Sequence, residues 1–498
     1  MASLSLSMRA RRIASFVTTA VGLGAIGLSL VSSPTALTAC SEKAPAPVGA
    51  KPVVIGVTLG LSGRFDSRAA PMRQAILVAQ AQLNAAGGVL GRPVEFRIVD
   101  DKGDEASGVQ GVAQAFVADR VAGVIGPIGS GQVLAVQGIF SGAKIPQISP
   151  SATAAELSTV QPEAERFLFR TAPSDNVQGR AAVYFAMNHN PTLDSDAGVA
   201  DSGSVIDSGS VTDSGVKPDG GTVDSGVPVS TVTSCKNMAI LSVDNAYGNG
   251  LAVTIRDTFK NKGGTVVDFT AVPVPVAADY KDIVNRVLDT HPDCQVLAVY
   301  QDVGAQYMKD LAAARAERPT ALPNGFFVIG TDGVYNAGFI ENSRADKANA
   351  LSASAAEGTF GTFPDTNPDL TEYNEFKTLF KSYFPFAPGV TDTGPYASNT
   401  FDAAILMALA IESAGTDTDG AKIRDELTRV SSGGQAFSAG QLSELLTAIR
   451  EKVDVDYKGA SGRVNFDGFG DVVEDFIVWR VVGGQFTVVR HVTSAELE

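Results

Sequence analysis

The sequence predicts an α/β protein with two doubly wound, Rossmann-like lobes. Short apolar runs alternate with helical patterns from Val53 onward, and the same alternation restarts after the segment FLFRTAP at 167–173. Strands that alternate with helices build parallel sheets with helices on both faces. The length of 498 residues agrees with this division, because one hydrophobic core rarely serves so long a chain.

The first lobe is predicted from three strand-like runs and the helical patterns between them. VVIGVTL at 53–59 is a short apolar run, and VEFRIVDD at 94–101 alternates in period two, which indicates a strand with one more exposed face. Between them, the segment 72–88 has apolar residues at helical spacing and ends in two glycines. An apolar stripe at 109–117 predicts the next helix, which leads into the strand-like run VAGVIGP at 121–127.

The second lobe repeats this order. Its predicted strands are MAILSV (238–243), TVVDFTAV (265–272), VLAVY (296–300) and FFVIG (326–330), and its predicted helices lie at 251–261, 280–289 and 306–316. Farther along, a long helix is expected at 400–415, shorter helices near 423 and 442, and strands at 462–467, 474–482 and 485–492. These late strands need sheet edges to pair with, so we expect the C-terminal part to return to both lobes.

The expected domain boundaries follow from these runs. They are a signal peptide at 1–39, a tether at 40–52, the first part of lobe 1 at 53–170, the first part of lobe 2 at 171–357, a return to lobe 1 at 358–457, and C-terminal strands, mainly of lobe 2, at 458–498. Lobe 2 also contains an insertion at 191–234, where DSG recurs and no aromatic residue occurs. We expect this insertion to be disordered, because it cannot form a core and lacks the regular ligand spacing of a calcium-binding repeat.

The N-terminus has the order of an export signal. Arginines between residues 9 and 12 precede an apolar run at 13–31, and LTAC follows at 37–40. This order resembles bacterial lipoprotein signals, which implies cleavage before Cys40, acylation of that cysteine and attachment to a membrane of the cell envelope. The alternative is a single membrane-spanning helix formed by the apolar run.

Composition and charge restrict the function classes. The formal net charge of −15 argues against nucleic acid as a partner, because phosphate binding needs clustered Lys and Arg. The histidines lack metal-ligand spacing with any cysteine, and the mature chain contains no GxSxG elbow and no phosphate loop. We therefore expect no catalytic residue, no metal and no cofactor.

Two further cysteines, Cys235 and Cys294, each lie just ahead of a predicted strand. In an exported protein an even pair of cysteines indicates a disulfide. If the two strands are parallel neighbours, both sulfur atoms lie at the same end of the sheet. The alternative is a pair of buried free thiols.

Three strand-to-helix junctions carry small polar residues, at the end of the sheet where ligands bind in such folds. They are GPIGSGQ with Ser130, ISPSAT with Ser151 and Thr153, and IGTDGVYN with Asp332. Helix N-termini offer free N–H groups to an anion, and a carboxylate in the facing lobe suits a cationic group. On spacing alone, the hydroxyl residues are equally explained as helix caps and Asp332 as part of an Asp-Gly turn.

Ten segments, taken in order, carry a family resemblance. They are IGVTLGLSG, LNAAGGVLGRPVEFRIVDD, GVIGPIGS, IPQISPSAT, FRTAPSDNVQG, DNAYGNGLA, VIGTDG, EGTFGTF, FDAAILMALA and GRVNFDGFGD. Together they resemble the type I periplasmic solute-binding proteins, specifically the branched-chain amino-acid and amide-binding group that serves ABC importers. The resemblance implies two α/β lobes that close around a solute and are joined by three crossovers, near TAPSD (171–175), TFPDT (362–366) and YKGAS (457–461).

The resemblance also implies roles for single residues. Ser130, Ser151, Ala152 and Thr153 are expected to receive a ligand's carboxylate, Tyr247 to line the second lobe, and Asp332 to hold an ammonium group.

Two positions depart from the family pattern. The segment LGLSGRFDSRAAPM places Arg64 and Arg68 where a ligand's side chain is expected, and Asp332 stands where the family usually has glutamate. Arg68 is therefore a further candidate ligand residue, for an acidic or polar ligand. The branched-chain specificity of the family does not transfer to this chain.

The function implied by the resemblance is capture of a small polar solute, an amino acid or a related amide. The chain is expected to act as a monomer that delivers this solute to the membrane subunits of an ABC importer. The alternative is a ligand-sensing component of the same fold that acts on a separate signalling partner. An enzyme, the third class, is not expected.

Overall fold

The computed structural model describes residues 49–497 except 105, 190–233, 275, 350, 366–369 and 387–391. All of these residues belong to one compact unit, Lys43–Glu498. The predicted signal peptide and tether, the acylated Cys40 and the DSG-rich insertion up to residue 233 lie outside the described residues. Within the described part of the chain, none of the helices combines the length and hydrophobicity needed to span a bilayer.

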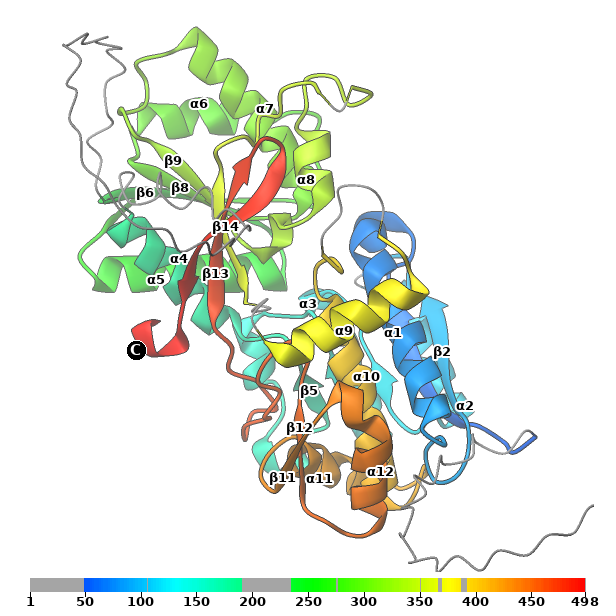
Figure 1. The fold of residues 1–498 in the computed structure, drawn as a ribbon. Helices are drawn as coiled ribbons and strands as arrows, with labels where there is room; N and C mark the ends of the chain where they lie inside the picture. The colour runs from blue at the N-terminus through cyan, green and yellow to red at the C-terminus, as the bar shows by residue number, and fades with distance from the viewer. Residues whose placement is uncertain are drawn as a thin grey trace, which may run out of the picture. The chain divides into compact units, whose positions relative to one another are not determined.

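The first sheet has five parallel strands in the order β2-β1-β3-β4-β5. The strands are β1 (Val53–Leu59), β2 (Val94–Asp100), β3 (Val124–Ile125), β4 (Gln147–Ser149) and β5 (Leu168–Arg170). Its helices are α1 (Asp66–Ala85), α2 (Ser107–Asp119), α3 (Ser130–Gly142), α9 (Thr371–Tyr383), α10 (Ala397–Ala414), α11 (Gly420–Val430) and α12 (Leu442–Arg450). Helix α1 packs on α10, and α2 packs on α3 in a separate apolar cluster, so helices cover both faces of the sheet (Figure 1).

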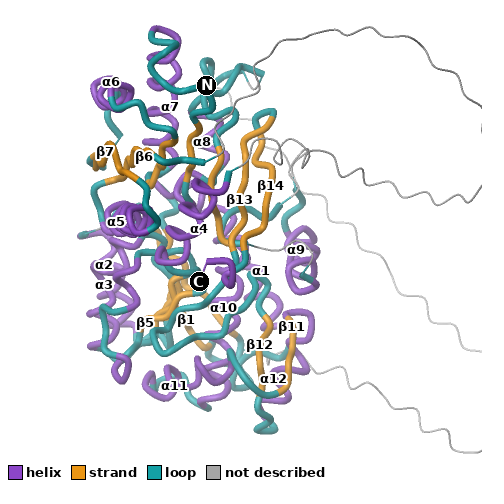
Figure 2. Tube along the Cα trace, turned by 90° about the vertical axis from the view of Figure 1, so that its left-hand side faces the viewer, coloured by secondary structure: helices purple, strands orange, loops and turns teal. Residues whose placement is uncertain are grey.

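The second sheet has seven strands in the order β14-β13-β10-β9-β8-β6-β7. They are β6 (Asn237–Val243), β7 (Thr265–Val272), β8 (Cys294–Ala298), β9 (Phe327–Gly330), β10 (Phe360–Pro364), β13 (Phe476–Val482) and β14 (Gln485–Val492). Its helices are α4 (Asp175–Asn188), α5 (Ala246–Asn261), α6 (Lys281–Asp289), α7 (Gln301–Glu317) and α8 (Ala337–Asn342). Five strands are parallel, and β13 and β14 add an antiparallel hairpin at one edge (Figure 2). The predicted α/β fold with two doubly wound lobes is confirmed.

Strand β10 corrects one expected boundary. The sequence analysis assigned residues 358–457 to lobe 1, whereas β10 pairs with β9 and β13 inside the second sheet. The strand fits there because Gly361 faces the ring of Trp479: a Cβ atom on Gly361 would lie 2.0 Å from Trp479 Cζ2. The return to the first lobe therefore begins after β10.

A second correction concerns the run GRVNFD at 462–467. It forms no strand, although the strands expected at 474–482 and 485–492 are present. Instead, β11 (Gln435–Ser438) and β12 (Val455–Lys458), which the sequence analysis missed, form a small parallel sheet. The apolar residues of 462–467 are buried without pairing, because this segment belongs to a connection between the two lobes.

The chain passes between the lobes three times. Residues 171–174 connect β5 to α4, residues 365–370 connect β10 to α9, and residues 459–475 connect β12 to β13. The last two connections touch, since the N–H of Asp365 donates to the carbonyl oxygen of Asp475 over 2.8 Å. The three positions agree with the crossovers expected near TAPSD, TFPDT and YKGAS.

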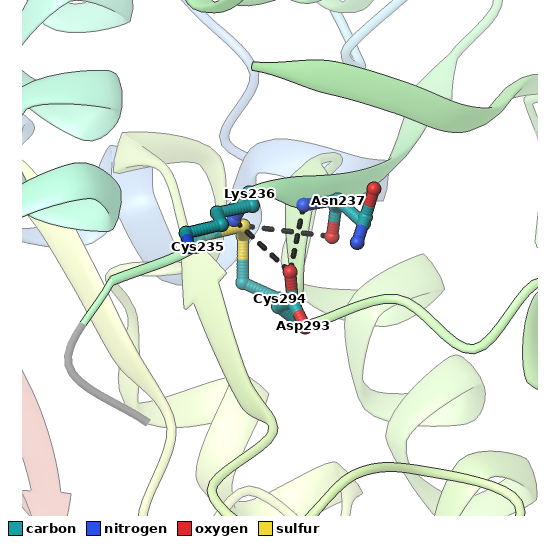
Figure 3. Close-up of a disulfide and its surroundings, with 5 residues drawn as sticks. All are labelled: Cys235, Lys236, Asn237, Asp293 and Cys294. Atoms are coloured by element: carbon teal, nitrogen blue, oxygen red, sulfur yellow. Dashed lines mark hydrogen bonds between the residues drawn. A yellow bond between two sulfur atoms is a disulfide. The ribbon is translucent and has the colours of Figure 1, made fainter. Parts of the chain in front are cut away.

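The predicted disulfide between Cys235 and Cys294 is present, with a Cα–Cα distance of 5.7 Å. Strands β6 and β8 are parallel neighbours, and Cys294 is the register partner of Met238. Both sulfur atoms therefore lie at the same end of the sheet, as expected. Figure 3 shows that Asp293 reinforces this end, because its Oδ2 accepts hydrogen bonds from the N–H groups of Lys236 and Asn237.

Removal of this disulfide is expected to destabilise the protein. The bond joins cysteines 59 residues apart, and a cross-link over such a loop restricts the unfolded chain by an amount worth about 4 kcal/mol. A Cys235→Ser/Cys294→Ser variant should therefore unfold at a lower urea concentration, measured by circular dichroism. A Cys40→Ser variant is the control, and an unchanged midpoint in the double variant would contradict the expectation.

Candidate functional site

Two turns at the carboxyl end of the first sheet present hydroxyl groups. Ser130 begins α3, and Ser151 and Thr153 follow β4; each of the three is at most 4% exposed. The Ser130 hydroxyl accepts a hydrogen bond from the Ala154 N–H, which joins the two turns. Thr153 Oγ1 is buried and has no hydrogen-bond partner among the described residues. The turns therefore hold a buried hydroxyl beside the N-terminus of a helix.

The position of these turns depends on an ion pair behind them. Arg170, at the end of β5, is 2% exposed and pairs with Asp471 of the third crossover over 2.6 Å and 2.8 Å. Its Nη1 donates to the carbonyl oxygen of Ala154 over 2.9 Å. The guanidinium thus fixes the backbone of the ISPSAT turn, and a buried bidentate pair of this kind is geometrically specific.

Asp332, directly after β9 in the second lobe, is a buried carboxylate with two tyrosine donors. Its Oδ1 accepts from the Tyr247 hydroxyl over 2.7 Å and its Oδ2 from the Tyr396 hydroxyl over 2.8 Å. Burial, and then the charge of Asp332, raise the pKa of both phenols well above the usual value of 10.0. Both hydroxyls therefore keep their protons and remain donors to the carboxylate. Tyr396 precedes α10, so it reaches Asp332 from the first lobe.

Arg68 on α1 reaches the same point from the first lobe. It is 3% exposed, and its Nη2 donates to the backbone carbonyl oxygens of Asp332 over 3.0 Å and Gly333 over 3.3 Å. Its guanidinium lies over the ring of Tyr396, with Cζ 5.4 Å from the ring centroid. Arg64, by contrast, is directed at Tyr300, with Cζ 5.5 Å from that ring's centroid.

These groups line one small cavity between the two lobes, of about 10 Å³, which is room for about one water molecule. Its lining comprises Phe65, Arg68, Ile128, Gly129, Ser130, Ser151, Thr153, Tyr247, Tyr300 and Asp332. The structure thus brings together six of the seven ligand residues expected from the sequence. The seventh, Ala152, lies outside the lining and packs in an apolar cluster with Val133 and Leu157.

The chain matches a family model described as "Periplasmic binding protein" over residues 52–444. It belongs to this family. The recognition as a type I periplasmic binding protein of the branched-chain amino-acid group is therefore confirmed, and the family is one of extracytoplasmic solute-binding proteins.

Two curated relatives and one solved structure illustrate the similarity. The chain is 24% identical to the Leu/Ile/Val-binding protein BraC3 of Rhizobium johnstonii over 62% of this chain and 73% of that protein. It is 24% identical to the chemotactic signal transduction system substrate-binding protein BasB of Halobacterium salinarum, over 86% of each chain. The crystal structure of a leucine binding protein, LivK, from Thermotoga maritima shares its fold with a TM-score of 0.64 and 18% identity, over 89% of this chain and 99% of that one.

The sequence analysis missed two polar residues of this binding protein's site. Tyr396 has no motif around it, and its position depends on a left-handed backbone (φ 58°) just ahead of α10. Asp175, the first residue of α4, is fully buried. Its N–H donates to the carbonyl oxygen of Thr153. Its carboxyl oxygens have no hydrogen-bond partner among the described residues. The only sequence signal at Asp175 was an acidic residue in a first helical turn, which is common in any helix.

Asp175 adds a second carboxyl group near Asp332. Burial raises the pKa of Asp175 well above its usual value of 3.8, and the charge of Asp332 acts in the same direction, while the charge of Arg170 acts against it. Asp175 therefore keeps its proton at pH values where an exposed aspartate is ionised.

The pH dependence of the protein's free energy of unfolding is expected to show that Asp175 keeps its proton. The pKa of Asp175 is higher in the folded than in the unfolded state, so its contribution to stability is present below about pH 4 and is lost as the pH rises. Asp175→Asn removes the titration. The free energy of unfolding of this variant, measured by urea titration, should therefore improve relative to wild type between about pH 4 and about pH 8.

Asp104→Asn is the matched control for this measurement. Asp104 is partly exposed, and the N–H groups of Ala106 and Gly108 lower its pKa, so any effect should be small and of opposite sign. A difference between Asp175→Asn and wild type that does not change with pH would contradict the assignment.

Proposed function

We propose that this protein captures a small solute with a carboxylate and an ammonium group, an amino acid or a related amide, between its lobes. The observation that carries the proposal is the cavity in which Asp332 of the second lobe faces the hydroxyl groups of Ser130 and Thr153 of the first. A ligand with an anionic and a cationic end complements this arrangement. Leu/Ile/Val-binding relatives support the amino-acid class.

The anionic end is assigned to the first lobe. Thr153 Oγ1 is a buried hydroxyl without a partner among the described residues, and α3 begins at Ser130 with its first N–H groups directed outward along the helix axis. One helix N-terminus stabilises an anion by about 0.3–1 kcal/mol, and by up to ~2 kcal/mol when partly buried. Several donors must act together, and the two turns supply them.

The cationic end is assigned to Asp332. An ionised carboxylate has about four acceptor positions, and the Tyr247 and Tyr396 hydroxyls use one on each oxygen. Acceptor capacity therefore remains for an ammonium group.

Capture is proposed to occur by closure of the lobes. A ligand held first by Ser130 and Thr153 gains contacts to Asp332 and Tyr247 only when the lobes approach, and this difference in affinity shifts the population toward the closed form. The closed monomer, tethered through an acylated Cys40, is then the form that the membrane subunits of an ABC importer recognise. No step of this cycle changes a covalent bond of the ligand, so the protein is not an enzyme.

Ligand binding is expected to raise the melting temperature. At 100 times the dissociation constant a ligand adds about 2.7 kcal/mol to the stability, so a thermal-shift screen of amino acids, their amides and small carboxylates should identify a binder. Thr153→Ala and Asp332→Asn should each weaken that binder by about 30-fold or more, because each removes a partner of a buried charged group. Isothermal titration calorimetry measures the loss.

The control for Thr153→Ala is Thr159→Ala, since Thr159 is exposed and bonds only its own turn. Its affinity should equal that of wild type. No binder in the screen, or full affinity in both site variants, would contradict the proposal.

A sensing role is the second candidate, and the match to BasB over 86% of each chain favours it. Import and sensing differ in what a deletion strain loses. For the importer, deletion of the gene should abolish uptake of the radiolabelled ligand at low concentration. Normal uptake together with a lost behavioural or transcriptional response to the ligand would favour the sensor.

A further inference from the structure

We infer that Arg68 selects an amino acid whose side chain carries a second carboxylate. The inference rests on the proposed function, because it assumes that an amino acid binds between Thr153 and Asp332. Arg68 lines the same cavity as these two residues, and it enters from α1.

Arg68 is a buried cation without an ion pair. No acidic side chain among the described residues lies within 4.0 Å of its guanidinium, and its Nε is buried with no acceptor. Arg170, which is equally buried, differs in having a bidentate partner in Asp471. Burial of a charge is costly unless an opposite charge meets it, so an unpaired arginine in a binding cavity indicates an anionic partner that comes with the ligand.

The position of Arg68 identifies which part of the ligand it meets. Its Nη2 is fixed to the backbone carbonyls of Asp332 and Gly333, at the end of the cavity assigned to the ammonium group. The α-carboxylate lies at the other end, where Ser130, Thr153 and the N-terminus of α3 already supply enough donors. Arg68 is therefore placed for the group that branches from the ligand's Cα near the ammonium.

Charge decides the nature of that group. With a neutral side chain, the ligand's ammonium pairs with the carboxylate of Asp332, and Arg68, which contacts only backbone carbonyls there, has no counter-charge. Two cations in a buried site repel each other unless an anion lies between them. A side-chain carboxylate supplies this anion, and it also gives Nε of Arg68 an acceptor.

The experiment compares ligands that differ in charge but hardly in size. L-Aspartate with L-asparagine, and L-glutamate with L-glutamine, are titrated into the wild-type protein by isothermal titration calorimetry. At least one acid should bind about 30-fold or more tightly than its amide, the factor typical of a buried charge pair. Arg68→Gln should remove this ratio, and Arg68→Lys should retain part of it because the charge remains.

The ratio of acid affinity to amide affinity distinguishes ligand selection by Arg68 from a general role of Arg68 in closing the lobes. Loss of the bonds to Asp332 and Gly333 weakens acid and amide alike, so only a change in their ratio supports the inference. Arg73→Gln, on the same helix but with an exposed side chain, is the control and should leave the ratio unchanged. A wild type that prefers the amides or leucine, or an unchanged ratio in Arg68→Gln, overturns the inference and leaves the proposed function intact. Binding of no amino acid at all overturns both.

Discussion

The contact between the two lobes depends on hydrogen bonds to one buried group, the carboxylate of Asp332. It belongs to the second lobe, yet Tyr396 donates to it from the first lobe and Arg68 donates to its backbone carbonyl. A carboxylate removed from water loses several kcal/mol of solvation, and each hydrogen bond to a charged group returns about 1.5–3 kcal/mol. The two phenols supply such hydrogen bonds to Asp332, and the first lobe contributes one of them. The contact between the lobes and the hydrogen bonding of the buried carboxylate therefore support each other.

The two turns assigned to the ligand's carboxylate depend on a second buried pair. Arg170 connects β5, the ISPSAT turn and Asp471, and Asp471 lies in the third crossover. This crossover also touches the second one through Asp365 and Asp475. The second and third crossovers are thus bonded to the first lobe's half of the site, so Ser130 and Thr153 are expected to keep their geometry during the proposed closure.

Local patterns predicted much of this structure. Apolar alternation located β1 to β3 and β6 to β9, and the rule that ligands bind at the carboxyl ends of strands selected Ser130, Thr153 and Asp332. Patterns failed where long-range packing decides the outcome. β10 joins the second sheet because Gly361 accommodates Trp479, and GRVNFD looks like a strand although it is a buried connection.

The same distinction applies to the polar residues of the site. Tyr247 was found through its family motif, AYG, and Arg68 through its departure from one. Tyr396 and Asp175 acquire their roles from the tertiary structure alone: one through a left-handed turn ahead of α10, the other through the complete burial of a residue that begins α4. No spacing in the sequence encodes either position.

In the proposed mechanism, closure and selectivity use the same residues, which links them energetically. Arg68 and Tyr396 bond Asp332 across the lobes, and the proposed ligand binds among these three residues. A ligand that leaves Arg68 without a counter-charge therefore weakens the closed form itself. A ligand that pairs with it stabilises the closed form beyond its own contacts, because the closed population depends on the difference in affinity between the two states.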